Sequence, residues 1–403
     1  MALITVSDAL ARILEQAQPL GTEDVPLVEA HGRVLARDLS ALRTQPPTDV
    51  SAMDGYAVRA ADVGSAPASL ALIGEVAAGH PGKEAVRPGE AARIFTGGVV
   101  PAGADTIVIQ ENTERDGDRV VVKAGAPAGK HIRRAGIDFA KGDLLLPRGR
   151  RLTGRDVMLA AAGNHALLPV YRQPHVAMFA TGDELVMPGR EPGPGQIVYS
   201  NGYALMALAR AEGADVVDLG VVPDRMDETM AALRRAREAG ADVLVTTGGA
   251  SVGEYDLMHR AYTTDGFALS FWKVALRPGR PLMYGQRGSM RALGLPGNPV
   301  SAFVCAFLFL VPLIRVLTGR VDFEHPIESL PVGCDMPGND GRADYMRATI
   351  AHSPDGREVV TPWPTQDSSL MRALAKADCL LIRPPNSPPA KAGDLCPVLK
   401  LSL

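Results

Sequence analysis

The stretch DVLVTTGGASVGEYD (residues 242–256) joins an apolar run to a glycine-rich loop that ends with two acids. Residues 242–247 have the length and the β-branched content of a buried strand. Gly248 and Gly249 follow where that strand ends. One interpretation is a turn that merely needs a positive φ. The other is a loop whose backbone amides approach an anion, with carboxylates beside it.

Three further apolar runs resemble this strand, at residues 175–180, 214–219 and 292–295. Helical patterns separate them, for example Met230, Leu233 and Ala236 at helical spacing before Gly240. Alternating strands and helices predict a parallel sheet with right-handed crossovers. We therefore expect an α/β domain over residues 173–320.

Each strand of this domain is followed by a polar loop, and in open α/β sheets ligands bind outside the carboxyl ends of the strands. This placement favours the anion-binding interpretation of the loop after residue 247. The predicted binding residues in these loops are Thr181, Gly248, Gly249, Ser251, Gly253, Pro296, Gly297, Asn298, Pro299 and Ser301.

The segment FWKVALRPGRP (residues 271–281) places Lys273, Arg277 and Arg280 around a Pro-Gly turn. A solvated basic hairpin is the ordinary interpretation of such a run. Here it lies between the two glycine-bearing loops, so cations and amides are expected at one sheet edge. That combination suits a ligand with more than one phosphate-like group.

Acids also follow the strands, and carboxylates that face a phosphate site repel it unless a hard cation mediates. Magnesium is the expected mediator because it takes oxygen ligands and bridges phosphates. We predict Glu184 and Asp256 as its ligands, whereas Asp227 is interpreted as a helix cap. The acids that follow strands are Asp183, Glu184, Asp224, Glu254 and Asp256.

The composition is that of a globular protein with several domains: 403 residues, 46% hydrophobic and 22% charged. A net charge of −3 and a pI near 6.3 argue against nucleic-acid or membrane-surface binding driven by bulk charge. The longest apolar stretch, residues 300–316, contains Ser301, Cys305, Pro312 and Arg315, so no membrane span is expected. The N-terminus lacks the pattern of a signal peptide.

The four cysteines show neither close pairing nor metal-ligand spacing. We interpret them as reduced thiols of a cytoplasmic protein. Outside the α/β domain, residues 44–137 read as a small β-rich domain and residues 321–403 as a small barrel-like β domain. Residues 1–43 together with 138–172 are expected to form a helical connecting layer. The stretch SAMDGYA (51–57) says little by spacing alone.

The order of several motifs resembles the molybdopterin molybdenumtransferase family, which includes bacterial MoeA, the gephyrin E domain and plant Cnx1E. They are PPTDVSAMDGYAVR, GEVAAG, FTGGVVPAGADTIVIQE, RRAGIDF, ATGDELV, TTGGASVGEYD, FWKVALRPGRP and GLPGNPVSA. The resemblance covers essentially the whole chain.

This resemblance implies an elongated homodimer of four-domain chains, in which the α/β unit is a MogA-like, molybdopterin-binding domain. It implies that adenylylated molybdopterin and molybdate yield molybdenum cofactor and AMP, assisted by magnesium. A molybdopterin adenylyltransferase would supply the substrate, and molybdoenzymes or their chaperones would accept the product. The pterin's dithiolene sulfurs bind molybdenum, so the protein needs no cysteine ligands.

Carried over position by position, the resemblance assigns functional roles to both acids and basic residues. Where many members have Lys-Pro-Gly-Lys-Pro, this chain has Arg277-Pro-Gly-Arg280-Pro, so forked guanidinium groups replace point charges. Arg347 and Ser368 are expected to bind the cofactor. The expected catalytic residues are Asp54, Asp138, Glu184, Asp224, Asp256, Lys273 and Arg277.

Asp54 and Asp138 bracket the β-rich domain, so folding or a second subunit must bring them to the α/β edge. We favour completion of the site by the second subunit. Two other functions compete. One is an adenylyltransferase on the same α/β module, against which the additional domains argue. The other is a scaffold without catalysis, against which the retained acids and cations weigh.

Overall fold

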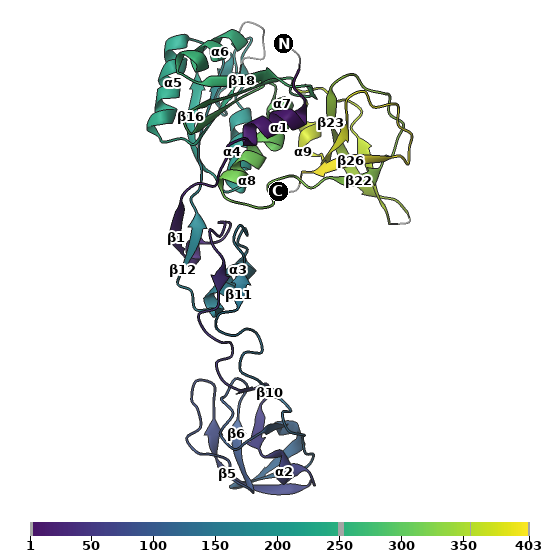
Figure 1. Cartoon of the computed structure of the whole chain (residues 1–403). Helices are drawn as coiled ribbons and strands as arrows, with labels where there is room; N and C mark the ends of the chain where they lie inside the picture. Colours follow the sequence, from purple (N-terminus) through teal and green to yellow (C-terminus); the bar gives the residue numbers. More distant parts are fainter. Residues whose placement is uncertain (1–2, 249–253, 355, 402–403) are drawn as a thin grey trace.

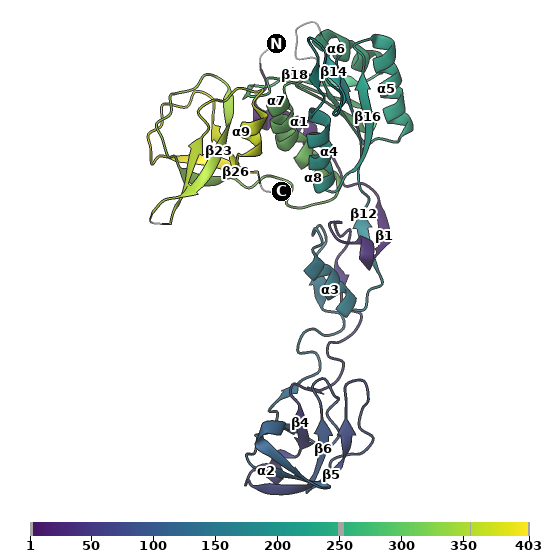
Figure 2. The ribbon, with the colours of Figure 1, turned by 180° about the vertical axis from the view of Figure 1, so that it is seen from behind.

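The computed structural model describes residues 3–248, 254–354 and 356–401. The chain is elongated (Figures 1 and 2). The α/β domain and the C-terminal β domain lie beside each other at one end, and the β-rich domain lies at the opposite end. Two chain segments run between them through the connecting region. The expectation of an α/β multidomain fold is confirmed.

The α/β domain contains a six-stranded sheet in the order β16-β13-β17-β21-β20-β18. The first four strands are parallel, as expected, but β20 runs antiparallel to both β21 and β18. The sheet is therefore mixed, which corrects the expectation of a parallel sheet. Its strands are β13 (His175–Thr181), β16 (Asp215–Val222), β17 (Val243–Thr247), β18 (Ala268–Lys273), β20 (Pro281–Arg287) and β21 (Met290–Leu295).

Alternating side chains of the central strands enter two cores, as strand geometry requires. Val243 and Val245 pack in the core on one face, and Leu244 packs in the core on the other. The first core holds α1 (Val6–Leu14), α4 (Asn201–Ala211), α7 (Pro299–Cys305) and α8 (Val311–Leu317). The second holds α5 (Met226–Glu238) and α6 (Glu254–Thr264).

Helices α7 and α8 are continuous through the π-helical segment η3 (Ala306–Leu310). The amide of Val311 donates to the carbonyl of Ala306, and Pro312 has no N–H to continue this pattern to Phe307. His325 satisfies that carbonyl instead, with Nε2 2.7 Å from Phe307 O. The helical span Pro299–Leu317 is apolar and long enough to cross a membrane, but it is 89% buried within the protein and forms part of the core.

The connecting region contains strand pairs as well as a helix. Helix α1 lies outside it, because Ala9 and Ile13 are buried in the α/β core. This placement differs from the expectation that the first helix belongs to the connecting layer. The region is built from β1 (Thr22–Pro26) with β12 (Leu167–Tyr171), β2 (Leu39–Ser40) with β11 (Leu144–Leu146), η1 (Leu27–Glu29) and α3 (Gly154–Ala162).

The β-rich domain contains a sheet in the order β7-β4-β6-β5-β9-β8, and the short strands β3 and β10 form a separate pair. Its elements are β3 (Val50–Ser51), β4 (Gly55–Val58), α2 (Ala60–Val63), β5 (Ala68–Val76), β6 (Glu90–Ile94), β7 (Thr106–Ile109), η2 (Gln110–Asn112), β8 (Thr113–Asp116), β9 (Arg119–Val122) and β10 (Ile132–Arg133).

The C-terminal β domain has the strand order β19-β23-β25-β26-β22, with β24 paired to β23. Strand β19 comes from the FWKVALRPGRP segment of the α/β domain, so the two domains share a sheet. Helix α9 contacts α7. The elements are β19 (Leu276–Arg277), β22 (Glu328–Pro331), β23 (Ala343–His352), β24 (Glu358–Pro362), α9 (Met371–Ala375), β25 (Cys379–Arg383) and β26 (Leu395–Lys400).

Candidate functional site

A cavity of about 610 Å³ opens at the carboxyl edge of the α/β sheet. The loops after β13, β17 and β21 contribute to its wall, as do the short pair β14 (Leu185–Val186) and β15 (Ile197–Val198). Ser369 and Met371 of the C-terminal domain complete it. The structure therefore brings together these predicted site residues: Thr181, Glu184, Gly248, Gly297, Asn298 and Pro299.

Two glycines permit close packing at the cavity mouth. Gly248 has φ +139°, and a Cβ there would lie 2.3 Å from Thr181 O. Gly182 has φ +153°, and a Cβ there would lie 2.6 Å from Glu184 Oε2. At Gly248 a side chain would meet the Thr181 backbone, so the position requires glycine. At Gly182 the Glu184 carboxylate could move aside, and the positive φ is what favours glycine. Gly249, Ser251 and Gly253 lie outside the described residues, as does the side chain of Asp256.

Asp224 is held beside this edge by reciprocal contacts with Asp183. The amide of Asp183 donates to Asp224 Oδ2 at 3.3 Å, and the amide of Asp224 donates to Asp183 Oδ1 at 3.2 Å. Asp224 Oδ1 is buried and has no hydrogen-bond partner. No group of three or more His, Cys, Asp or Glu side chains suited to a metal was found in the described part of the chain.

The loop of residues 296–301 is fixed from both sides. Asn201 Nδ2 donates to Gly297 O at 2.6 Å, and Asn298 Nδ2 donates to Ser368 Oγ at 2.9 Å. The amide of Val300 donates to Ser368 O at 3.1 Å. Pro296 and Ser301, the two ends of this loop, are buried and do not line the cavity. Ser368 thus holds the cavity wall from the C-terminal domain.

The basic segment divides between two places. Lys273 is exposed at the end of β18, opposite Pro281 and at the edge where β17 and β21 end. Arg277 instead points into the domain junction, where its Nε lies 3.4 Å from Asp344 Oδ1 and its Nη2 pairs with Asp340. Arg277 therefore does not line the sheet-edge cavity, whereas the sequence predicted that all the cations would lie at that edge.

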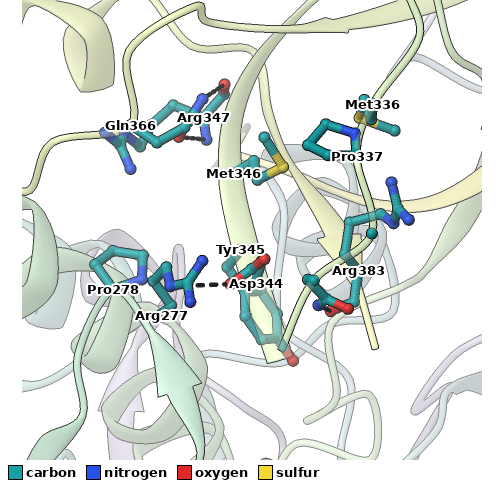
Figure 3. A pocket seen from close by; sticks show the side chains of 12 residues that line it. Arg277, Pro278, Met336, Pro337, Asp344, Tyr345, Met346, Arg347, Gln366 and Arg383 are labelled. Atoms are coloured by element: carbon teal, nitrogen blue, oxygen red, sulfur yellow. Dashed lines mark hydrogen bonds and ion pairs between the residues drawn. The ribbon is translucent and has the colours of Figure 1, made fainter. Parts of the chain in front are cut away.

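A second pocket, of about 170 Å³, lies at this junction (Figure 3). Arg347 lines it and is fully buried, at 0% exposure. Its Nη2 donates to Asp367 O at 2.8 Å, while its Nε and Nη1 have no partner. Burial lowers the pKa of the Arg347 guanidinium and raises the pKa of the neighbouring Asp344 carboxyl. Two buried N–H donors without acceptors suit an oxyanion.

Asp54 lies between β3 and β4 of the β-rich domain, which is at the opposite end of the molecule from both pockets (Figure 1). Asp138 lies on the segment after β10 that leads back to the connecting region, where its amide donates to Gln45 O at 3.2 Å. Asp54 accepts hydrogen bonds from the amide and the hydroxyl of Thr96, both at 2.8 Å. These bonds hold the pKa of the Asp54 carboxyl below its ordinary value. Asp138, which follows β10 in the sequence, is exposed. Folding of one chain thus leaves these acids apart from the cavity.

Several residues that shape the cavity, the second pocket and the surroundings of Asp54 were not predicted from the sequence. Tyr199 lines the cavity at 2% exposure, and its hydroxyl lies where a Cβ on Gly202 would sit, at 1.6 Å. Thr96 fixes Asp54, and Gln366 lines the second pocket. The glycine after Ser200-Asn201 and the FTGG motif were the signals available for Tyr199 and Thr96. Gln366 lies two residues before Ser368, in the stretch QDSSLMRALAKADC to which the resemblance extends, and that position was the signal available for it.

Comparison with known proteins covers almost the entire chain. Residues 4–163 match the MoeA N-terminal region (domains I and II), and residues 177–316 match a probable molybdopterin binding domain. Residues 329–401 match the MoeA C-terminal region (domain IV). The chain is therefore similar along its length to proteins built from these regions.

The similarity to named relatives also covers most of each chain. The chain is 36% identical to the molybdopterin molybdenumtransferase of Nostoc sp. over 90% of this chain and 85% of that protein. It is 34% identical to that of Haemophilus influenzae over 94% of both. A structure of a molybdopterin biosynthesis MoeA protein from Pyrococcus horikoshii matches with a TM-score of 0.81, at 29% identity over 99% of this chain and 100% of that chain.

These matches define a transferase of molybdenum cofactor biosynthesis with a molybdopterin-binding α/β domain. The chain belongs to the molybdopterin molybdenumtransferase (MoeA) family. The resemblance drawn from the motifs is thereby confirmed.

Proposed function

We propose that this chain is a molybdenum insertase that uses molybdate and adenylylated molybdopterin to form molybdenum cofactor, with release of AMP. The proposal is carried by the Arg347 guanidinium, which is buried in the wall of the second pocket and leaves Nε and Nη1 without a hydrogen-bond partner. The cavity would take the phosphate-bearing pterin, and the Arg347 pocket would take the molybdate dianion.

The chemistry needs positioning and proton movement. Two molybdenum–sulfur bonds form and one molybdenum–oxygen bond breaks, and the two thiol protons leave with that oxygen as water. Water cleaves the phosphoanhydride to give AMP. In this scheme Arg347 holds the dianion, and the loop at Gly248 lets backbone approach the phosphates. Lys273 would offset the summed negative charge at the same sheet edge.

Magnesium fits the acids of this edge. Asp224 offers an unpartnered buried oxygen, and Glu184 lines the cavity. Magnesium typically binds through one or two carboxylates together with water and substrate phosphates, so a compact cluster of three acids is not needed. The candidate ligands are therefore Glu184 and Asp224, with Asp256 retained from the sequence. When bound, the ion would neutralise charge on the phosphates.

We further propose that a homodimer completes each site, with Asp54 and Asp138 supplied by the second chain. The separation of these acids from the cavity within one chain supports this arrangement. We place the reaction in the cytoplasm, where the four cysteines of the chain would stay reduced. There a molybdopterin adenylyltransferase would supply the substrate, and molybdoenzymes or their chaperones would accept the product.

Mixed dimers test the shared site. Asp54→Ala and Arg347→Met chains should each be inactive alone. If the two residues act across the interface, half of the sites in every mixed dimer are intact, so an equal mixture should regain about a quarter of wild-type activity. If they act within one chain, mixing restores nothing and the arrangement is wrong.

The reaction itself is tested with two incubations of the purified protein. Adenylylated molybdopterin with molybdate should give molybdenum cofactor, whereas molybdopterin with ATP and no molybdate should remain unchanged. Adenylylated product in the second incubation would instead identify an activating enzyme. Absence of product in both, with the ligands bound, would favour a scaffold.

A further inference from the structure

A short segment of the C-terminal domain, residues 366–369, connects the two pockets. On one side Arg347 Nη2 donates to Asp367 O at 2.8 Å. On the other side Ser368 accepts from Asn298 Nδ2 at 2.9 Å and from the amide of Val300 at 3.1 Å. We refer to residues 366–369 as the bridge. Its backbone touches the guanidinium and the cavity wall within two consecutive residues.

Gln366 ties the bridge to Arg347 through the main chain. Strand β24 ends at Pro362, and just beyond it the amide of Trp363 still donates to Arg347 O at 2.9 Å. The Gln366 amide adds to this bond: Oε1 accepts from Arg347 N at 3.0 Å, and Nε2 donates to Arg347 O at 3.0 Å and to Trp363 O at 2.8 Å. Figure 3 shows the two side chains next to each other.

These bonds leave the Arg347 backbone little freedom. Arg347 is fully buried, and its single hydrogen-bonded side-chain nitrogen is held by the residue that follows Gln366. A side chain positioned only by one carbonyl would need a fixed backbone to aim its two free donors at one point. Pairing of β23 with β25 and the bond from Trp363 N supply part of that restraint, and the Gln366 amide adds the bond to Arg347 N from inside the same pocket.

We propose that Gln366 is a positioning residue that holds the Arg347 guanidinium in place to bind the oxyanion beside the pterin cavity. This inference rests on the proposed function of the Arg347 pocket. Gln366 acts through Arg347 and makes no bond to the reacting atoms. Its loss should therefore weaken oxyanion capture and leave pterin binding intact, because Ser368 holds the cavity wall separately.

The test compares Gln366→Met, Gln366→Glu and the control Gln286→Met, which removes an amide from a half-buried position on β20. Each full-length protein is titrated with molybdate alone and with molybdopterin, and insertion is measured against molybdate concentration. Gln366→Met should raise the Kd and the KM for molybdate about tenfold, with kcat at saturation within about twofold, as loss of a buried hydrogen-bonding restraint implies.

Gln366→Glu should raise the molybdate KM more than Gln366→Met, because its carboxylate opposes the dianion in the same pocket, and added salt should reduce the difference. The control should resemble wild type. Unchanged molybdate affinity in both Gln366 variants, or an equal loss of molybdopterin affinity, would overturn the proposal. A wild-type protein that binds no molybdate would instead refute the proposed function.

Discussion

Replacing Arg347 with methionine should make the protein as stable as wild type, or more stable, while molybdate capture is lost. The reason lies in an unusual arrangement: the guanidinium is fully buried, yet it has one hydrogen bond and two unpartnered donors. An arginine retained for folding would have its donors satisfied. Methionine keeps the apolar stem and removes both the charge and the donors.

The magnitude follows from these contacts. The lost charge-assisted bond to Asp367 O is worth about 1.5–3 kcal/mol. Relief of two buried unsatisfied N–H groups returns about 1–3 kcal/mol each. These ranges put the net change in the free energy of unfolding between about 1 kcal/mol against the variant and about 4 kcal/mol in its favour, with a central value of about 2 kcal/mol in its favour. Two lost bonds to the dianion should weaken molybdate binding by about a hundredfold or more.

The assay pairs thermal unfolding with titration of molybdate, using Arg383→Met as the control. Arg383 is buried in the wall of the same pocket, but it donates to the carbonyl of Pro388 and leaves no buried side-chain nitrogen without a partner. Its replacement should destabilise the domain more than that of Arg347. If Arg347→Met instead lowers stability by more than about 2 kcal/mol and molybdate affinity is unchanged, the arginine is structural.

Three other changes have defined outcomes. Gly248→Ala should lower affinity for adenylylated molybdopterin more than it lowers the melting temperature, since the added Cβ meets Thr181 O at 2.3 Å at the cavity mouth; equal affinity in a calorimetric titration would contradict this. Asp54→Asn should unfold like wild type but fail in insertion, because the amide oxygen still accepts from Thr96 while the charge is lost; full activity would remove Asp54 from the site. Burial lowers the pKa of His325 to about 4, so the unfolded chain binds a proton that the folded chain excludes, and the resulting stability is present above pH 6.5 and lost as the pH falls toward 4. The loss between pH 7.5 and pH 5 should be about 2 kcal/mol, and His325→Gln, which can still donate to Phe307 O, should lack it in denaturant titrations.

The sequence predicted the features that depend on local patterns. The four parallel strands were recognisable because each is a short apolar run next to a helical period. The cavity loops were recognisable because glycine and proline mark the points where those strands end. Six of the predicted binding and acidic residues lie around one cavity for this reason.

The remaining features depend on contacts distant in sequence. Strands β18 and β20 contain Lys273, Gly285 and Gln286, which give no clear apolar run, and their pairing fixes them as strands. Arg277 does not lie at the predicted edge, because β19 pairs with β23 and this residue of the α/β segment thereby belongs to the sheet of the C-terminal domain. Helix α1 joined the α/β core for a similar reason, through packing against α8.

The Gln366–Arg347 contact shows the same limit at the level of one side chain. The two residues are 19 positions apart and lie on different segments of the C-terminal domain. A glutamine in a polar stretch has many possible partners, and only the folded strand edge beyond Pro362 brings the amide of Arg347 to it.

The most direct measurement of the central claim is the amount of AMP released from adenylylated molybdopterin as molybdate is varied. Molybdenum incorporated into the cofactor is counted in the same samples. AMP and incorporated molybdenum should rise together in a one-to-one ratio, both should require molybdate, and both should disappear in Arg347→Met at low molybdate. AMP release that is independent of molybdate, or molybdenum incorporation without AMP, would contradict the claim.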